Sequence, residues 1–201
     1  DEEIVLLYNV IEPSLSENEK YILAKLKEVL VQIIDVSLED VRHQNKLINF
    51  LETRVHHLID EYNFKINEKE YVKIMYYIWR DFVGLNRIEP MMNDPYVEDI
   101  GCDGKNIPVY VVHQKFGSVR TNVLYTEEKE LREFVIKLAE RADRYISYAE
   151  PLLDGTLRDG SRVQASLAAD VTTRGPTFSI RKFKETPFTP VDMLRLGTVN
   201  E

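Results

Sequence analysis

The stretch EPLLDGTLRDGSRVQASL, residues 150–167, contains two Asp-Gly pairs five residues apart, and Arg158 and Arg162 flank the second pair. Asp-Gly favours the tight turns that join antiparallel strands, so residues 158–161 predict a hairpin. Side chains on the returning strand alternate between an apolar face, Val163, Ala165 and Leu167, and a polar face, Arg162, Gln164 and Ser166. The stretch therefore predicts a sheet whose polar face carries arginine.

A second strand further along the chain repeats this alternation. In TTRGPTFSIRKF, residues 172–183, apolar residues alternate with Ser179 and Arg181. If the apolar sides of both strands pack on one core, Arg162 and Arg181 project from the same polar face. Two guanidinium groups hold a phosphate in a bidentate manner, more specifically than lysines would. The pattern thus makes these arginines candidates for an anion site.

The residues leave a second interpretation of these arginines open. They pair with a nearby carboxylate, such as Asp154, Asp159 or Asp170, and contribute little. The pattern alone does not decide between the two interpretations, because arginine is common on exposed polar faces.

The first part of the chain, residues 1–85, predicts a bundle of three helices with short connections. Two capping boxes, Ser16 with Glu19 and Asn67 with Glu70, mark the starts of the first and third helices. Apolar residues recur at helical spacing after each box and between them. These residues therefore predict amphipathic helices around a common core.

Past the helical part, the pattern changes to short strands and turns. Residues 107–124 predict a hairpin, and residues 127–142 predict a helix with one apolar face. The predicted fold class is α+β, with a helical bundle over residues 1–85 and an antiparallel sheet with a covering helix over residues 86–188. Residues 189–201 are predicted to form a linker.

The composition excludes several classes of protein. The formal net charge is −8 and the sequence pI is about 5.2, which argues against general nucleic-acid binding. Cys102 is the single cysteine, so the chain needs no oxidising compartment. The sequence contains no apolar run of about 20 residues, and its acidic start differs from a signal peptide. These features predict a soluble protein of the cytoplasm.

Two groups of potential metal ligands do not have the spacing of a metal site. Adjacent residues on a helix, such as His56 and His57, point about 100° apart. The acidic residues near Cys102 match no calcium loop and predict a solvated turn and strand entry: Asp94, Glu98, Asp99 and Asp103. We expect no metal site in this chain.

Several stretches together resemble one family. Residues 150–167 and 172–183, followed by PFTPVDML at 187–194, resemble the region before the nucleotide-binding domain in the secretion ATPase superfamily. That superfamily includes the type II and type IV secretion ATPases, the type IV pilus motors and the archaellum motor. LNRIEPMMNDPYVEDIGCDG, residues 85–104, and VYVVHQKFGSVRTNV, residues 109–123, resemble the same module in its archaeal branch.

The resemblance implies a fold and a set of nucleotide contacts. It implies that residues 86–188 form a PAS-like domain that precedes a RecA-like ATPase domain in a hexamer. In the family, arginines of the N-terminal domain reach the phosphates of ATP, and the matching positions here are Arg162 and Arg181. Arg158 and Arg174 are further candidates that lie in turns. Thr189 and Pro190, in the linker, are candidates for contact with the base.

The sequence lacks the motifs that would let this chain hydrolyse ATP alone. The nearest approach to a Walker A loop is Gly104-Lys105, but Asp99 stands where the first glycine belongs and Asn106 where Ser or Thr belongs. We therefore expect ATP and Mg²⁺ only together with the ATPase domain that the family carries.

The resemblance also implies partners and a location. The partners would be the chain's own ATPase domain, neighbouring subunits of a homohexamer, a polytopic membrane platform protein and accessory scaffold proteins, and not nucleic acid. The protein would lie in the cytoplasm and associate with the inner face of the membrane through these partners. The acidic helical bundle would serve recruitment.

Two other classes of function stay open at this point. The chain is alternatively a non-catalytic adaptor that binds partner proteins through its helical bundle; a natural stop near Glu201 would favour this class. It is alternatively a small-ligand sensor, since PAS-like folds often enclose a ligand. A sensor predicts a sizeable apolar cavity, whereas a phosphate site predicts a filled core and a polar arginine face.

Overall fold

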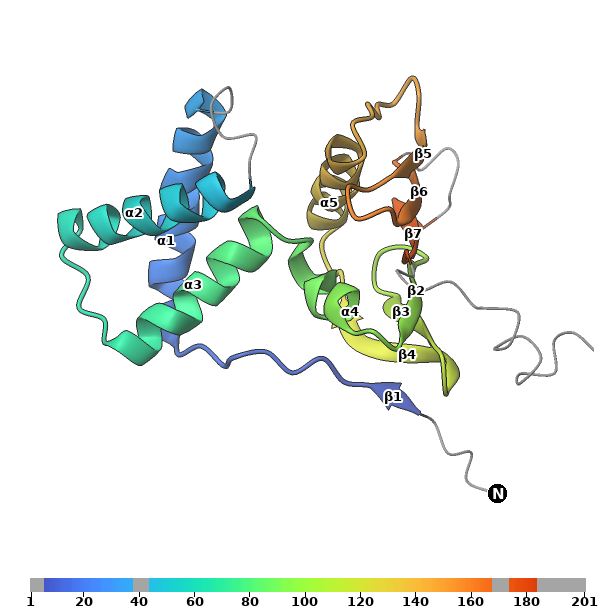
Figure 1. Ribbon diagram of the computed structural model, residues 1–201, viewed down its shortest axis with the longest axis horizontal. Helices are drawn as coiled ribbons and strands as arrows, with labels where there is room; N and C mark the ends of the chain where they lie inside the picture. Colours follow the sequence, from blue (N-terminus) through green and yellow to red (C-terminus); the bar gives the residue numbers. More distant parts are fainter. Residues whose placement is uncertain (1–5, 38–43, 168–173, 184–201) are drawn as a thin grey trace, which may run out of the picture. The chain divides into compact units, whose positions relative to one another are not determined.

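The computed structural model describes residues 6–37, 44–167 and 174–183 (Figure 1). The chain forms two compact units, a helical unit, Asn9–Asp94, and a sheet unit made of Asp1–Tyr8 together with Pro95–Glu201. The helical unit is therefore inserted between two segments of the sheet unit. The sequence placed the end of the helical part at residue 85, nine residues before this division.

The helical unit contains three long helices: α1 (Glu17–Ser37), α2 (Gln44–Glu61) and α3 (Glu68–Phe82). A short 3₁₀ helix, η1 (Asn86–Ile88), and α4 (Glu89–Asn93) follow them. Both predicted capping boxes are confirmed. The Glu19 N–H donates to Ser16 Oγ at 3.3 Å, and the Glu70 N–H donates to Asn67 Oδ1 at 3.0 Å; the reciprocal bonds to the Glu side chains are also present.

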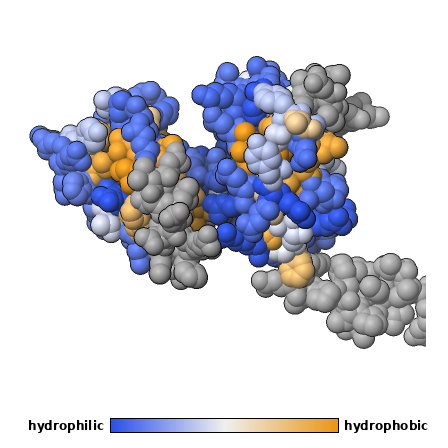
Figure 2. Space-filling view, turned by 90° about the horizontal axis from the view of Figure 1, so that it is seen from above, coloured by the Kyte–Doolittle hydropathy of each residue, from blue (hydrophilic) through white to orange (hydrophobic). Residues whose placement is uncertain are grey.

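The three helices enclose one apolar core, with one side of each helix buried. On the face shown in Figure 2, hydrophobic residues gather towards the middle of each unit and hydrophilic residues surround them. The fully or nearly fully buried residues of the helical core are Ile22, Leu23, Leu26, Leu30, Leu51, Val55, Leu58, Ile74, Ile78 and Val83. Their helical spacing is the apolar periodicity that the sequence shows.

A polar network fastens the segment before α1 to α3. Arg80 is 8% exposed; its Nη1 donates to both carboxylate oxygens of Glu12 at 2.8 Å and its Nε to Asp81 Oδ1 at 2.7 Å. The Tyr76 hydroxyl also donates to Glu12, at 2.9 Å. Lys27 on α1 forms an ion pair with Asp81. The charges in this part of the core are thus compensated by partners, as burial requires.

The described residues of the sheet unit form seven strands, in the order β1-β4-β3-β2-β7-β6-β5. Their bounds are Leu7–Tyr8 (β1), Val97–Cys102 (β2), Pro108–His113 (β3), Gly117–Leu124 (β4), Leu152–Thr156 (β5), Arg162–Ser166 (β6) and Thr177–Arg181 (β7). All neighbouring strands are antiparallel except β1, which is parallel to β4. Both predicted hairpins are confirmed.

Helix α5 (Glu128–Arg141) covers one face of this sheet (Figure 1). Its buried side meets the apolar face of β6 and β7, and the ring centroids of Phe134 and Phe178 lie 5.1 Å apart. Tyr125, 1% exposed, stacks against Phe134 at 5.8 Å. The predicted α+β class, a helical bundle and an antiparallel sheet with a covering helix, is confirmed, with one short parallel strand added at an edge.

The central strand β2 differs from the sequence prediction. The predicted turn and strand entry are confirmed at residues 95–97, where a turn leads into β2, but Glu98 and Asp99 lie within this six-residue strand, between β3 and β7, and not in a solvated turn. Ile100 and Cys102 on this strand are fully buried. The local sequence VEDIGC is acidic, but strand pairing on both sides and one buried face outweigh that composition.

Candidate anion-binding site

Arg162 and Arg181 lie directly opposite each other. In the antiparallel register of β6 and β7 their Cα atoms are partners, and the next residues inward, Val163 and Ile180, are also partners and fully buried. The arginine side chains are 67% and 79% exposed. The prediction that both arginines project from one polar face, opposite the face that α5 covers, is therefore confirmed.

The turn before β6 fixes the start of the arginine-bearing strand. Gly160 has a φ of +88°, a conformation that favours glycine, and the Leu157 N–H donates to Ser161 O at 2.8 Å. Ser161 Oγ donates to Asp159 Oδ2 at 2.8 Å and accepts from the Phe183 N–H at 3.1 Å. The hairpin turn is thus bonded to the backbone two residues after β7, which stabilises the neighbouring positions of the two strands.

Each arginine has a carboxylate partner. Arg162 Nη2 lies 3.4 Å from Asp154 Oδ2, the partner that the alternative interpretation named first. Arg181 Nε donates to Asp99 Oδ1 at 3.0 Å, a partner on β2 that the sequence did not predict. The Asp159 side chain instead accepts a hydrogen bond from the Ser161 N–H within the turn. Asp170 lies outside the described residues. Ion pairs this exposed contribute little to stability and are readily exchanged.

Two open hollows lie beside these pairs. One, of about 490 Å³, is lined in part by Tyr110, Asp154, Gln164 and Ser179. The other, of about 740 Å³, is lined by Ala142, Arg144, Asp154, Gly155, Thr156 and Arg162. Asp154 lines both hollows, so movement of its side chain away from Arg162 would enlarge both of them.

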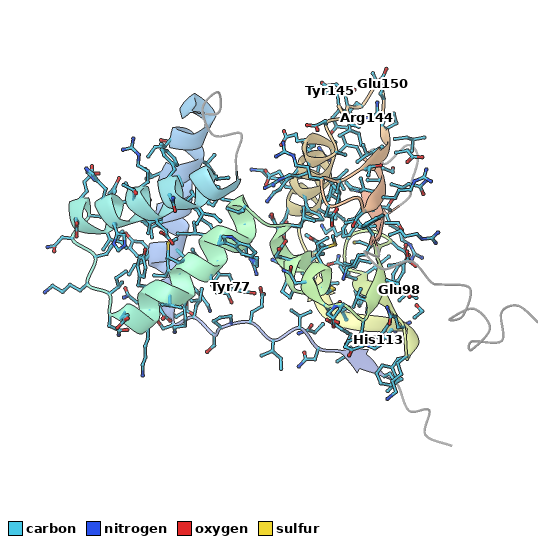
Figure 3. All side chains as sticks on the ribbon, in the orientation of Figure 1. Tyr77, Glu98, His113, Arg144, Tyr145 and Glu150 are labelled. Carbon is cyan, nitrogen blue, oxygen red and sulfur yellow. The ribbon has the colours of Figure 1, made fainter. Side chains whose placement is uncertain are left out.

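Arg144 is a basic residue that the sequence did not single out as a site candidate. It is exposed and lies in the connection between α5 and β5, the connection that also carries Tyr145 and Glu150 (Figure 3). A Cβ added at Gly155 would lie 2.9 Å from Ala142 Cβ, so the close approach of this connection to β5 depends on glycine. That approach brings Arg144 and Arg162 to the same hollow.

The remaining candidate residues differ in how close they lie to the arginine pair. Arg158 is exposed in the β5–β6 turn, at the end of the sheet where Arg162 lies. Arg174 precedes β7, at the opposite end of that strand from Arg181, and its carbonyl oxygen accepts from the Lys105 N–H at 3.1 Å. The structure therefore does not bring Arg174 to the arginine pair. Thr189 and Pro190 lie outside the described residues.

Of the potential metal ligands, His56 contacts an aromatic residue and Cys102 is fully buried. The His56 ring stacks on Tyr71 with centroids 4.7 Å apart, and its Nε2 lies 3.0 Å from the Tyr71 hydroxyl. Burial raises the pKa of the Cys102 thiol to about 11. Within residues 6–37, 44–167 and 174–183, no group of three or more His, Cys, Asp or Glu side chains is placed to hold a metal ion.

Comparison with known proteins finds relatives in an archaeon. No family model matches the chain. The chain is 33% identical to the uncharacterized protein MJ1288 of Methanocaldococcus jannaschii over 165 aligned residues. The alignment covers 82% of this chain and 65% of that protein. The chain is 36% identical to the uncharacterized protein MJ0900 of the same organism, over 95% of this chain and 38% of that protein. The chain therefore spans less than two thirds of the length of these relatives.

Among solved structures, part of this chain is similar to part of the VirB11 ATPase from the Brucella suis type IV secretion system, whose crystal structure is in complex with sulphate. The TM-score is 0.45 with 20% sequence identity, over 55% of this chain and 32% of that chain. In the part of the chain that the structure describes, no helix is long and apolar enough to cross a membrane.

Proposed function

We propose that this chain is the N-terminal regulatory portion of an archaeal-type motor ATPase for secretion, pilus or archaellum assembly. In this proposal Arg162 and Arg181 contact the phosphates of an ATP molecule held by an adjoining ATPase domain. The observation that carries the proposal is the pairing of the two arginines at opposed positions of β6 and β7. The sequence resemblance at residues 150–167 and 172–183 and the relatives in an archaeon support it.

The electrostatics of the arginine pair support a role in anion binding rather than a purely structural role. Like charges at directly opposed positions of antiparallel strands destabilise a sheet. Arg162 and Arg181 nevertheless stand at such positions with highly exposed side chains. A phosphate between or above them would engage both guanidinium groups at once, through donors that their contacts with Asp154 and Asp99 do not use.

The proposed contact has two consequences for the ATPase cycle. An arginine supplied across a domain boundary neutralises the charge that develops in phosphoryl transfer, which is worth ~10³ to 10⁵ in rate. Loss of the γ-phosphate contact after hydrolysis would also free this domain to move, which is a recognised way to convert hydrolysis into motion. Mg²⁺ and the remaining catalytic groups would come from the adjoining domain.

The assembly that we propose follows from the same resemblance. The chain would work in a homohexamer, contact the neighbouring subunits, and meet a polytopic membrane platform protein and accessory scaffolds at the cytoplasmic face of the membrane. The helical unit, Asn9–Asp94, is the part that we assign to recruitment of such partners. Its own core and its position as an insertion between β1 and β2 support an independent recruiting module.

The test is steady-state ATP turnover by the full-length protein. We expect Arg162→Ala and Arg181→Ala to lower kcat by ~10² or more with a small change in KM, because the contacts strengthen in the transition state. Arg120→Ala is the matched control, since Arg120 is an exposed arginine on β4 of the same sheet. Unchanged kcat and KM in both test variants would make the pair structural and favour a non-catalytic adaptor.

A further inference from the structure

Four charged side chains form a row across the polar face of the sheet. Asp99 on β2 is the Cα partner of Arg181 on β7, and Arg181 is the partner of Arg162 on β6. Arg162 is paired in turn with Thr156 on β5, and Asp154 lies two residues away on the same face of that strand. The row reads acid, base, base, acid, and its formal charges sum to zero.

In this row, each arginine contacts its aspartate through one nitrogen of the guanidinium group. Among the described residues, Arg181 uses Nε towards Asp99, and Arg162 uses Nη2 towards Asp154 at 3.4 and 3.5 Å. Asp154 also accepts from Gln164 Nε2, at 3.4 Å. Each guanidinium carries five N–H donors, so these contacts with the described residues use only a minority of them.

The two aspartates differ in how firmly they are held. The Asp99 side chain is 26% exposed, whereas the Asp154 side chain is 57% exposed and its contacts to Arg162 are longer. Exposed ion pairs of this kind are weak, so a more highly charged anion that binds both guanidinium groups at once would replace them. Such an anion would also meet the negative charge of both carboxylates.

We propose that Asp99 and Asp154 are resident counter-ions of the arginine pair: they occupy Arg181 and Arg162 in the free protein and compete with an incoming phosphate chain. This inference rests on the proposed phosphate role of the arginines and adds its regulation. The competition keeps the face neutral while no phosphate is bound, and weakens phosphate binding to the level at which release remains fast. Asp99 and Asp154 are thus positioning residues that set affinity, without touching phosphate themselves.

The experiment is a calorimetric titration of sodium tripolyphosphate into the 201-residue chain at low salt. We expect Asp99→Asn and Asp154→Asn each to tighten binding by about three- to tenfold, because each removes one repulsive charge beside the site. Asp60→Asn on α2 is the control; it changes the net charge equally from an exposed position outside the sheet. Arg162→Ala and Arg181→Ala should each abolish the heat of binding.

The outcomes separate this inference from the proposed function. Loss of binding in both arginine variants, with both aspartate variants equal to wild type, would overturn the counter-ion role and leave the phosphate role standing. Wild-type binding in the arginine variants would overturn both. If wild type shows no binding, appearance of binding in the Asp99→Asn/Asp154→Asn double variant supports the inference, and its absence overturns it.

A further variant guards against an effect on folding. Asp154 is the more exposed of the two aspartates, so Asp154→Asn tests the inference even if Asp99→Asn destabilises the sheet. Asp99→Glu retains the charge and should restore wild-type affinity. Equal affinities for Asp99→Asn and Asp99→Glu, both tighter than wild type, would assign the effect to local packing and contradict the inference.

Discussion

Arg162 and Arg181 are directly opposed on β6 and β7, and each contacts an aspartate on the strand beyond, Asp154 on β5 and Asp99 on β2. Neither of the two interpretations open to the sequence is complete on its own. The arginines do pair with carboxylates, yet they also share one exposed face, and among the described residues each guanidinium contacts its carboxylate through a single nitrogen. A neutral row that a phosphate chain can enter reconciles the two.

The link between the hairpin turn and β7 should be important for stability. Ser161→Ala removes the acceptor of the Phe183 N–H and the donor to Asp159, so we expect a loss of about 1–2 kcal/mol in the free energy of unfolding. Urea denaturation followed by circular dichroism measures it. Ser118→Ala, at an exposed position on β4, should change it by less than about 0.5 kcal/mol. Equal effects of the two substitutions would refute the proposed link.

The buried arginine of the helical unit should be the most sensitive charged position there. Arg80→Ala leaves Glu12 and Asp81 without their main partner, and we expect it to cost about 3 kcal/mol. Trp79, the single tryptophan, lies on α3, so its fluorescence during urea denaturation reports on this unit. Lys20→Ala, which removes an exposed ion pair, is the control. A loss no greater than that of the control would contradict the network's role.

Asp81 should give the stability of the helical unit a specific pH dependence. Burial acts to raise the pKa of Asp81, but Arg80 and Lys27 outweigh it and hold that pKa below its usual range. A carboxylate with a lowered pKa stabilises the fold fully above the ordinary aspartate pKa of about 4, and this stabilisation is lost as the pH falls through the lower pKa of the folded state. The stability difference between wild type and Asp81→Asn should therefore be large at neutral pH and shrink in acid. A difference that stays constant with pH would rule this out.

Cys102 should be inert to alkylation in the folded protein. It is fully buried on β2, and burial raises the pKa of its thiol to about 11, so little thiolate is present at neutral pH. Because it is the single cysteine, mass spectrometry after iodoacetamide treatment reads its reaction directly. We expect alkylation in urea and almost none in buffer. Similar rates in both solvents would mean that β2 is not buried as described.

Local sequence signals predicted the parts of the fold that local interactions determine. The capping boxes at Ser16 and Asn67 and the hairpin turn before Arg162 depend on residues three or four positions apart, and each was confirmed. Strand alternation placed Arg162 and Arg181 on one face because the period of two is fixed by backbone geometry.

Long-range pairing accounts for what the sequence missed. β1 is two residues long and pairs with β4 more than 100 residues later, and the contact of Asp99 with Arg181 spans 82 residues. No local pattern encodes such pairings. Arg144 joins Arg162 only because Gly155 lets a connection approach β5 closely, which a glycine in a sequence does not reveal.

The most direct measurement is a structure of the full-length protein with a non-hydrolysable ATP analogue and Mg²⁺. The account predicts that guanidinium nitrogens of Arg162 and Arg181 lie about 2.7–3.2 Å from phosphate oxygens. It also predicts that Asp99 and Asp154 have moved away from the arginines. Arginines that still contact Asp99 and Asp154, while the phosphates are bound elsewhere by other residues, would contradict the central claim.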